Sequence, residues 1–329
     1  MRIAVADSAA AQIFKVHDEL VREIFVFCPD ALRPALAGRI VGQRHIIGLA
    51  VAETGKRVDD PWNSLVMPTP GGGFVINGKK IYTTGAAETD EIAVWAFNPT
   101  VPGIDTNPLL GFQLTLVARD ATGVIVHRDW AALGQRATDS GAVTFDSVVC
   151  STDRRASEPG RAPLPQNAVR YQAGFAAILV GIGIGAVQAA IPFINSTSRP
   201  WPSADVTSAV DDPMVRRLCA ELVAEIASAY HATMATAELL DAFDRGEITR
   251  TELAIPIYAA KASASRASMH ATSEIYALMG TRAASRSAGF DRYWRNARTL
   301  SLHDPLVWKH EEIGHHVITG WDPPPGIHR

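Results

Sequence analysis

Residues 72–85, with the sequence GGFVINGKKIYTTG, contain the strongest strand signal in the chain. β-branched and aromatic residues lie on both sides of Asn77-Gly78, as is typical of two short strands. Asn-Gly suits the positive φ angles of a type I′ turn. We therefore predict a β-hairpin in which residues 74–76 pair with residues 79–84.

The strand pattern continues beyond this hairpin. Further candidates, separated by Gly, Pro and Asp turns, are residues 91–97, 112–119, 123–127 and 142–149. No helical pattern of useful length interrupts them. Several short strands in succession predict an antiparallel barrel or sandwich. We assign this β domain to residues 45–155.

The segment before the β domain has a helical period. Apolar residues recur every three or four positions, at Ile13, Val16, Leu20, Ile24 and Phe27. This spacing predicts an amphipathic helix. Asp7 or Ser8 is expected to cap its start and Pro29 to end it. A second short helix is predicted over residues 30–41, and residues 1–44 form this helical part.

The chain becomes helical again after the polar, proline-bearing linker at residues 151–166. One apolar stripe comprises Leu218, Leu222, Ile226 and Tyr230. Residues 253–279 are rich in alanine and serine, which permits close helix packing. Long helices separated by short breaks predict a helical bundle over residues 156–329.

Composition limits the partners of the protein. Of its 329 residues, 47% are hydrophobic and 20% charged, and the formal net charge is −3. No long basic stretch is present, so neither nucleic acid nor an anionic membrane is an expected partner. The three cysteines, Cys28, Cys150 and Cys219, are far apart, which argues against a disulfide scaffold. The N-terminus lacks a signal-peptide pattern, and we expect a reducing, cytoplasmic setting.

Residues 173–194 carry no charge and are long enough to cross a bilayer. The alternative is the central helix of a bundle, apolar on all sides because it is buried on all sides. Only one such segment occurs in a chain of average hydropathy, so we favour the buried helix.

The same segment contains a dinucleotide-like motif, since Gly181, Gly183 and Ala186 satisfy G-x-G-x-x-A. A dinucleotide fold also requires a second strand ending in an acid roughly 20 residues later. That region instead reads SRPWP, residues 198–202. We interpret the glycines as positions of close helix packing.

Residues 72–85 resemble the corresponding segment of the acyl-CoA dehydrogenase middle domain. The resemblance implies that Tyr82 and Thr84 contact a flavin ring. Residues 133–140, LGQRATDS, and 143–148, VTFDSV, are similar to the next β segment of that family. In residues 197–201, TSRPW, Arg199 and Trp201 match an arginine and an aromatic that reach the flavin phosphate of a neighbouring subunit. Guanidinium geometry suits phosphate.

The C-terminal stretches 279–283, MGTRA, and 291–305, DRYWRNARTLSLHDP, resemble a particular branch of this superfamily. That branch contains dibenzothiophene monooxygenase and related sulfur-acquisition oxygenases, which use reduced flavin. True dehydrogenases carry Tyr-Glu-Gly-Thr here, and the Glu abstracts a proton from the thioester. This chain has Leu302-His303-Asp304-Pro305.

The resemblance covers essentially the whole chain and implies an α+β fold of the acyl-CoA dehydrogenase type. We expect a partial N-terminal helical domain (1–44), a middle antiparallel β-barrel (45–155) and a C-terminal four-helix bundle (156–329). One departure is that Met1 falls partway into the family's front helical domain, whose helices help to wall the substrate pocket. A second is residues 48–53, GLAVAE, where relatives place a polar residue against the flavin.

The resemblance implies a monooxygenase that uses reduced FMN, with FAD as another possible flavin, and O2 to oxygenate a small organic molecule that contains sulfur, nitrogen or an aromatic group. A separate flavin reductase would supply the FMN, and the expected assembly is a homotetramer. Arg199 would hold phosphate together with Arg282, and Thr84 would bond to the flavin edge. His303 is the first candidate for proton exchange and His17 the second.

Two other functions stay open. Alignment through residues 295–298 places Asp304 opposite the dehydrogenase Glu, which is compatible with a flavin dehydrogenase or oxidase using Asp304 as the base. A catalytically silent paralogue that keeps the fold for assembly is the other alternative. His310, His315 and His316 lie close together in sequence but lack a carboxylate pattern, so no metal site is predicted.

Overall fold

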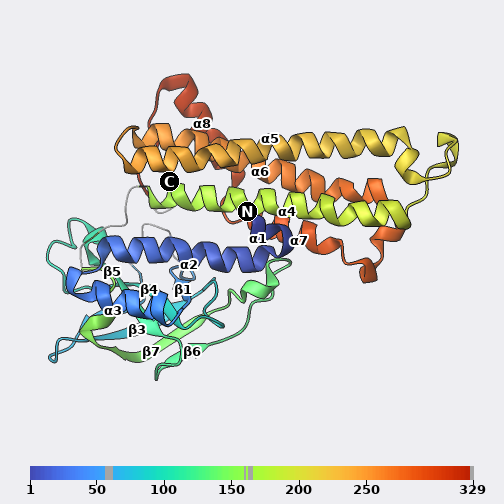
Figure 1. The fold of residues 1–329 in the computed structure, drawn as a ribbon. Helices are drawn as coiled ribbons and strands as arrows, with labels where there is room; N and C mark the ends of the chain where they lie inside the picture. The colour runs from blue at the N-terminus through green and yellow to red at the C-terminus, as the bar shows by residue number, and fades with distance from the viewer. Residues whose placement is uncertain (56–61, 159–160, 162–165, 327–329) are drawn as a thin grey trace. The chain divides into compact units, whose positions relative to one another are not determined.

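The computed structural model describes residues 1–55, 62–158, 161 and 166–326. The chain packs as two compact units. The bundle unit comprises residues 1–11, 132–135 and 165–329, and the β unit comprises residues 12–131 and 136–164. Figure 1 shows both units. Helices, then strands, then helices follow one another along the chain, as the sequence predicts.

The β unit is built on one sheet, with four predicted strands confirmed at β4 to β7. Its strands are β1 (Ile47–Ala50), β2 (Leu65–Pro68), β3 (Phe74–Lys80), β4 (Glu91–Phe97), β5 (Phe112–Ala118), β6 (Val124–Val126) and β7 (Val143–Cys150). The order is β1-β4-β2-β3-β7-β6, and β5 pairs with β4. The sheet is mixed rather than wholly antiparallel, because β1 and β2 both run parallel to β4.

The predicted turn at Asn77-Gly78 is wrong, because both residues lie inside the continuous strand β3. The register of β3 against β7 shifts between Ile76 and Gly78, which is the mark of a β-bulge. Gly78 has φ +151°, and a Cβ there would lie 2.3 Å from Oγ of Ser64. Glycine is therefore needed where β3 closely approaches Ser64, the residue just before β2. The hairpin turn lies earlier, where the Thr69 N–H donates to the Gly73 carbonyl between β2 and β3.

The predicted front helices are confirmed. They are α1 (Arg2–Ala6) and α2 (Ser8–Phe27), followed by η1 (Asp30–Leu32), α3 (Arg33–Ala37) and the π-helical turn η2 (Gly38–Gly42). Asp7 caps α2, since its Oδ1 accepts the N–H groups of Ala9 and Ala10 at 2.9 and 3.0 Å. Four of the five predicted stripe residues are buried: Val16, Leu20, Ile24 and Phe27.

The bundle unit consists mainly of three long helices that lie side by side (Figure 1). These are α4 (Asn167–Ser196), α5 (Pro213–Asp244) and α6 (Arg250–Met279), with the shorter α7 (Asp291–Ser301) and α8 (Leu306–Thr319) packed against α6. Thr249 and Glu252 form a capping box at the start of α6. The predicted bundle is thus confirmed.

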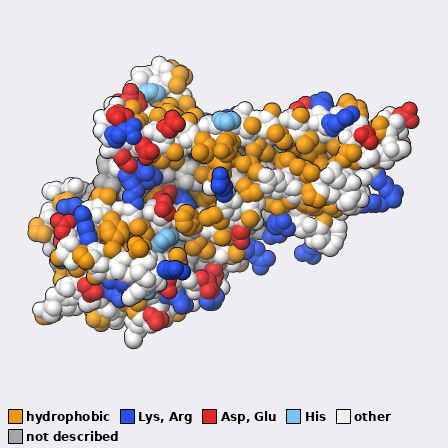
Figure 2. All heavy atoms as spheres, viewed as in Figure 1, with side chains coloured by type: hydrophobic (Ala, Val, Ile, Leu, Met, Phe, Trp, Pro, Cys, Tyr) orange, Lys and Arg blue, Asp and Glu red, His pale blue; other side chains and the backbone are white. Residues whose placement is uncertain are grey.

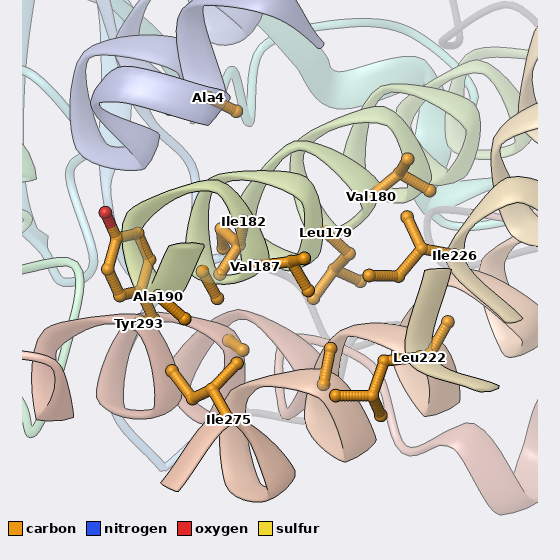
Figure 3. Packing of buried hydrophobic residues seen from close by; sticks show 14 of the residues in the cluster. Ala4, Leu179, Val180, Ile182, Val187, Ala190, Leu222, Ile226, Ile275 and Tyr293 are labelled. Atoms are coloured by element: carbon orange, nitrogen blue, oxygen red, sulfur yellow. The ribbon is translucent and has the colours of Figure 1, made fainter. Parts of the chain in front are cut away.

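Helix α4 is the core of the bundle. Among the described helices it alone is long and apolar enough to cross a membrane, but most of its apolar window is buried within the protein. Figure 3 shows Leu179 and Val187 of α4 packed toward Leu222 of α5 and Ile275 of α6. The expectation of a buried central helix is confirmed.

The glycines of α4 serve helix packing, as the sequence predicts. They lie in the middle of a helix rather than in a strand-to-helix turn. A Cβ at Gly181 would lie 2.8 Å from the carbonyl oxygen of Met1, and one at Gly185 would lie 2.3 Å from that of Val5. The short helix α1 therefore rests directly on α4.

A buried ion pair in the β unit joins the end of strand β3 to the segment between β1 and β2. Lys80 is fully buried, and its Nζ lies 2.8 Å from Oε1 of Glu53 and 4.1 Å from the centre of the Trp62 ring. Burial lowers the pKa of Lys80 to about 8, although Glu53 opposes that shift. Burial raises the pKa of Glu53, but the bond and charge of Lys80 and the N–H groups of Asn63 and Ser64 outweigh it and hold that pKa below its usual value.

We predict that Lys80→Met destabilises the protein by roughly 3 kcal/mol, because Glu53 stays buried without its counter-charge. The matched control is Lys79→Met, which alters an exposed lysine on the opposite face of the same strand. Urea unfolding at neutral pH measures both, and the control should stay within about 0.5 kcal/mol of the wild type.

The Lys80–Glu53 pair also predicts how the free energy of unfolding depends on pH above neutrality. Because the pKa of Lys80 lies near 8 in the folded protein against 10.5 for the ordinary group, the unfolded chain binds more protons between these values. The contribution of Lys80 to the free energy of unfolding therefore rises with pH across this window, and Lys80→Met should remove that rise. An equal rise in the variant would refute the assignment.

Candidate active site

The hydroxyl of Thr84 belongs to a buried cluster in the β unit. Its Oγ1 lies 3.0 Å from Oγ of Ser140, which in turn lies 2.7 Å from Oγ1 of Thr138. None of the three residues is more than 9% exposed. Hydroxyls donate and accept, so such a cluster suits a ligand edge that carries both kinds of group.

The cluster is held by backbone bonds rather than by a strand. The prediction that Thr84 ends a strand is wrong, because β3 ends at Lys80 and Thr84 lies in the turn that follows. The Thr83 N–H donates to the Gly141 carbonyl at 3.0 Å, and the Gly85 N–H donates to the Thr138 carbonyl at 3.1 Å. These bonds fix the two hydroxyl-bearing segments to each other.

Residues in a rarely populated backbone conformation surround the cluster. Tyr82, Arg128 and Asp139 have φ of +55°, +50° and +40°, in the region that favours glycine. Arg128 bridges Glu88 at 2.9 Å and Asp139 at 3.5 Å, which helps to hold the segment. Backbone strain of this kind concentrates at functional sites.

Tyr82, the predicted aromatic contact of the flavin, lies at the surface. It is 65% exposed. Its ring packs edge-to-face with the ring of Trp130, with ring centres 6.1 Å apart. Trp130 was not among the predicted site residues. Its pairing with Tyr82 depends on a contact across 48 positions in the chain, for which the sequence carries no signal.

His17, the second predicted proton carrier, joins α2 to the sheet. Its Nδ1 accepts the N–H of Ile47 at 3.1 Å. Burial lowers the pKa of His17, and the charge of Asp18 offsets this only partly. The ring is therefore neutral near pH 7, with its proton on Nε2.

The predicted phosphate ligands meet at one end of the bundle unit. The Arg282 guanidinium donates to the Thr197 carbonyl at 3.1 Å, and the Ser198 hydroxyl donates to the Met279 carbonyl at 3.0 Å. These bonds dock the segment that carries Arg199 onto the end of α6. Arg199 and Arg282 are both exposed. Trp201, the predicted aromatic partner, is 75% exposed.

His303 lies in the loop between α7 and α8. Its side chain is 46% exposed, and its ring packs on Phe175 of α4 with ring centres 4.2 Å apart. Nδ1 lies 3.2 Å from Oδ2 of Asp304. Asp304 is only 6% exposed, and its carboxylate also accepts the amide of Gln172. His303 thus faces outward while Asp304 stands behind it.

The predicted residues divide between the two units. His17, Tyr82 and Thr84 belong to the β unit, whereas Arg199, Trp201, Arg282 and His303 belong to the bundle unit. Among the described residues, no group of three or more His, Cys, Asp or Glu side chains could hold a metal ion.

Residues 133–135 are docked on α7 by a network that sequence reasoning missed. The backbone N–H groups of Gly134 and Gln135 donate to Oγ1 of Thr299 and to Oδ1 of Asn296, each at 2.8 Å. The Gln135 side chain accepts the Ser8 hydroxyl at 2.7 Å, and Asn296 donates to that hydroxyl at 3.0 Å. Two motifs more than 150 positions apart therefore meet in the bundle unit.

Two family models match the chain. Residues 48–148 match the acyl-CoA dehydrogenase middle domain, and residues 173–308 match the acyl-CoA dehydrogenase C-terminal domain. The chain is 31% identical to dibenzothiophene monooxygenase of Mycolicibacterium goodii, over 99% of this chain and 80% of that protein. It is 29% identical to a probable FMNH2-dependent monooxygenase of Pseudomonas putida, over 99% and 81%.

A solved structure agrees with these matches. FMN-bound TdsC of Paenibacillus sp. A11-2 superposes with a TM-score of 0.90 at 31% identity, over 99% of this chain and 84% of that chain. The predicted α+β fold, with a middle β domain and a helical C-terminal domain, is confirmed.

The docked segment predicts a sensitive glycine. A Cβ at Gly134 would lie 2.0 Å from the carbonyl oxygen of Arg295 and 2.6 Å from the nitrogen of Asn296. Because backbone atoms cannot step aside, Gly134→Ala should destabilise the protein by at least about 2 kcal/mol in urea unfolding. Gly71→Ala is the control, since nothing lies within 4 Å of its Cβ. Equal stability of the two variants would mean that the docking is not as described.

Proposed function

Because the chain belongs to the acyl-CoA dehydrogenase superfamily, in the branch that contains dibenzothiophene monooxygenases, we propose that it uses reduced FMN and O2 to oxygenate a small sulfur-containing or aromatic molecule. Bound reduced FMN supplies two electrons and activates O2, so that one oxygen atom passes to the substrate and the other leaves as water. A separate flavin reductase supplies the FMN, in line with the FMNH2-dependent relative.

The observation that carries this proposal over a dehydrogenase is the arrangement of His303 and Asp304. A dehydrogenase needs a carboxylate that reaches the substrate. Asp304 is buried and accepts bonds from Gln172 and His303, so it is poorly placed to act as that base. The half-exposed imidazole of His303 is the group that can exchange a proton with a bound molecule.

Other residues of this chain suit the binding of FMN. The hydroxyl cluster of Thr84, Ser140 and Thr138 can donate to and accept from the polar edge of the flavin ring. Arg199 and Arg282 offer guanidinium groups to the phosphate. His17, neutral and protonated on Nε2, is a second hydrogen-bond donor for the reaction.

The length of α4 favours an assembly in which subunits share flavin sites. His303 packs on Phe175 near the start of this helix, whereas Arg199 follows its end at Ser196. At 1.5 Å per residue these points are roughly 30 Å apart. One FMN molecule is much shorter, so the His303 and Arg199 that serve one flavin must come from different protomers.

The surface of the bundle fits this assembly. Figure 2 shows hydrophobic side chains gathered over its long helices. Large hydrophobic side chains that are exposed on these helices include Ile191 on α4 and Val223 and Met234 on α5. Exposed apolar surface of this kind marks interfaces. We propose a homotetramer in the cytoplasm.

The oxygenase proposal predicts transfer of oxygen from O2. The protein is mixed with reduced FMN, 18O2 and either dibenzothiophene or indole, and the product is examined by mass spectrometry. One 18O atom per product molecule is expected. His303→Ala should lower product formation at least about tenfold while FMN affinity is kept, because only proton exchange is lost.

His310→Ala, which alters an exposed histidine on α8, is the control and should retain full activity. Oxidation of a carbon acid without 18O incorporation would favour the dehydrogenase instead. Failure to bind FMN would indicate the silent paralogue.

The shared-site proposal predicts complementation between two defective variants. His303→Ala and Arg199→Ala should each be weakly active alone. Co-expressed hybrids should recover activity, because some sites combine an intact His303 from one protomer with an intact Arg199 from another. Arg199→Ala should also bind FMN about tenfold more weakly but riboflavin equally well, since riboflavin has no phosphate. Hybrids no more active than the two parents would place both residues in one protomer's site.

A further inference from the structure

Three buried polar side chains form a hydrogen-bonded line that ends at His303. Gln172 of α4, Lys261 of α6 and Asp304 are 2%, 1% and 6% exposed. Burying an ammonium and a carboxylate is costly unless each is bonded. The Lys261 ammonium lies 2.9 Å from Oε1 of Gln172, and the Gln172 amide donates to Oδ2 of Asp304. The two charges are thus connected through one neutral amide.

The direction of these bonds follows from what each group can do. An ammonium only donates, so the Gln172 atom that it meets must be the carbonyl oxygen. The amide nitrogen of Gln172 therefore faces Asp304 and donates to it. An ionised carboxylate only accepts, so Nδ1 of His303, 3.2 Å from Oδ2 of Asp304, must carry a proton.

Phe175 holds the line in place from one side. Its ring packs on the imidazole of His303 with centres 4.2 Å apart, and Nζ of Lys261 lies 5.3 Å from the centre of the same ring. The Phe175 ring therefore lies next to both Lys261, at one end of the line, and His303, at the other. Rotation of the imidazole away from Asp304 would break this packing as well as the hydrogen bond.

We propose that Lys261, Gln172 and Asp304 are positioning residues that fix the neutral His303 as its Nδ1–H tautomer, so that proton exchange takes place at Nε2. The chemical part of this inference rests on the proposed oxygenase function, whereas the tautomer does not. A histidine's tautomer is set by the partner of its other nitrogen. Asp304 is then not a catalytic base but the group that orients one.

The first test needs neither flavin nor substrate. The full chain is labelled with 15N-histidine, and the signal of His303, one of ten histidines, is assigned by its absence from His303→Ala. At a pH where the ring is neutral, the wild type should show protonated Nδ1 and unprotonated Nε2. An Nε2–H tautomer in the wild type would overturn the proposal without reference to any activity.

The variant Gln172→Met keeps the size of the side chain but removes both bonds. Because Asp304 then loses the bond that orients its carboxylate toward Nδ1, the variant should shift His303 toward the Nε2–H tautomer. Gln188→Met, at an exposed position of the same helix, should leave the tautomer unchanged. Should Gln172→Met fail to fold, Lys261→Met tests the same line, because it frees the Gln172 amide to turn over. An unshifted His303 signal in the folded variant contradicts the proposal.

The second test asks whether the line acts through His303. Gln172→Met should lower the product formed per reduced FMN consumed by about tenfold, because the charged carboxylate that orients His303 loses its bond from Gln172. In a His303→Ala background the same change should have no further effect. Equal losses in both backgrounds would show a merely structural role. Loss of FMN binding or of all oxygenation in the wild type would instead contradict the proposed function, and the NMR result would still decide the tautomer.

Discussion

The backbone of residues 133–135 lies directly on helix α7, with no side chain between them at Gly134. This segment belongs to the bundle unit, although the residues on both sides of it belong to the β unit. Its two backbone N–H groups are satisfied by Thr299 and Asn296, and the Gln135 side chain by Ser8. Buried polar groups need such partners. The docking therefore fixes the backbone of residues 133–135 within the bundle unit.

Buried charge is used in two ways. Lys80 and Glu53 form a direct ion pair next to the Trp62 ring, and Glu53 also accepts the N–H groups of Asn63 and Ser64. The role of this pair is to hold a strand and a loop together. The line from Lys261 to Asp304 instead ends at a histidine that is half exposed. A direct buried ion pair stabilises the fold, whereas a buried network that ends at an exposed titratable group can also take part in a reaction.

The length of helix α4 determines how far apart the candidate functional residues of the bundle unit lie. Its glycines allow α1 to approach, and its apolar faces are covered by α5 and α6, so it is both long and rigid. His303 lies near one end of this helix, and Arg199 and Arg282 lie at the other end. Our proposal that protomers share flavin sites rests on this separation, because one small cofactor cannot span it.

The sequence by itself determined the order of helices and strands, the buried nature of α4, the packing role of its glycines and the family. These follow from local periodicity and from residues that are neighbours in the chain. It did not determine the Asn77-Gly78 bulge, because an Asn-Gly pair also suits a turn, and the close contact of Gly78 with Ser64 arises only from tertiary packing. Nor did it find Gln172, Lys261, Ser140 or Trp130. Only tertiary packing brings residues 89 and 132 positions apart to one hydrogen-bonded line, and it also decided that His303 faces outward with Asp304 behind it.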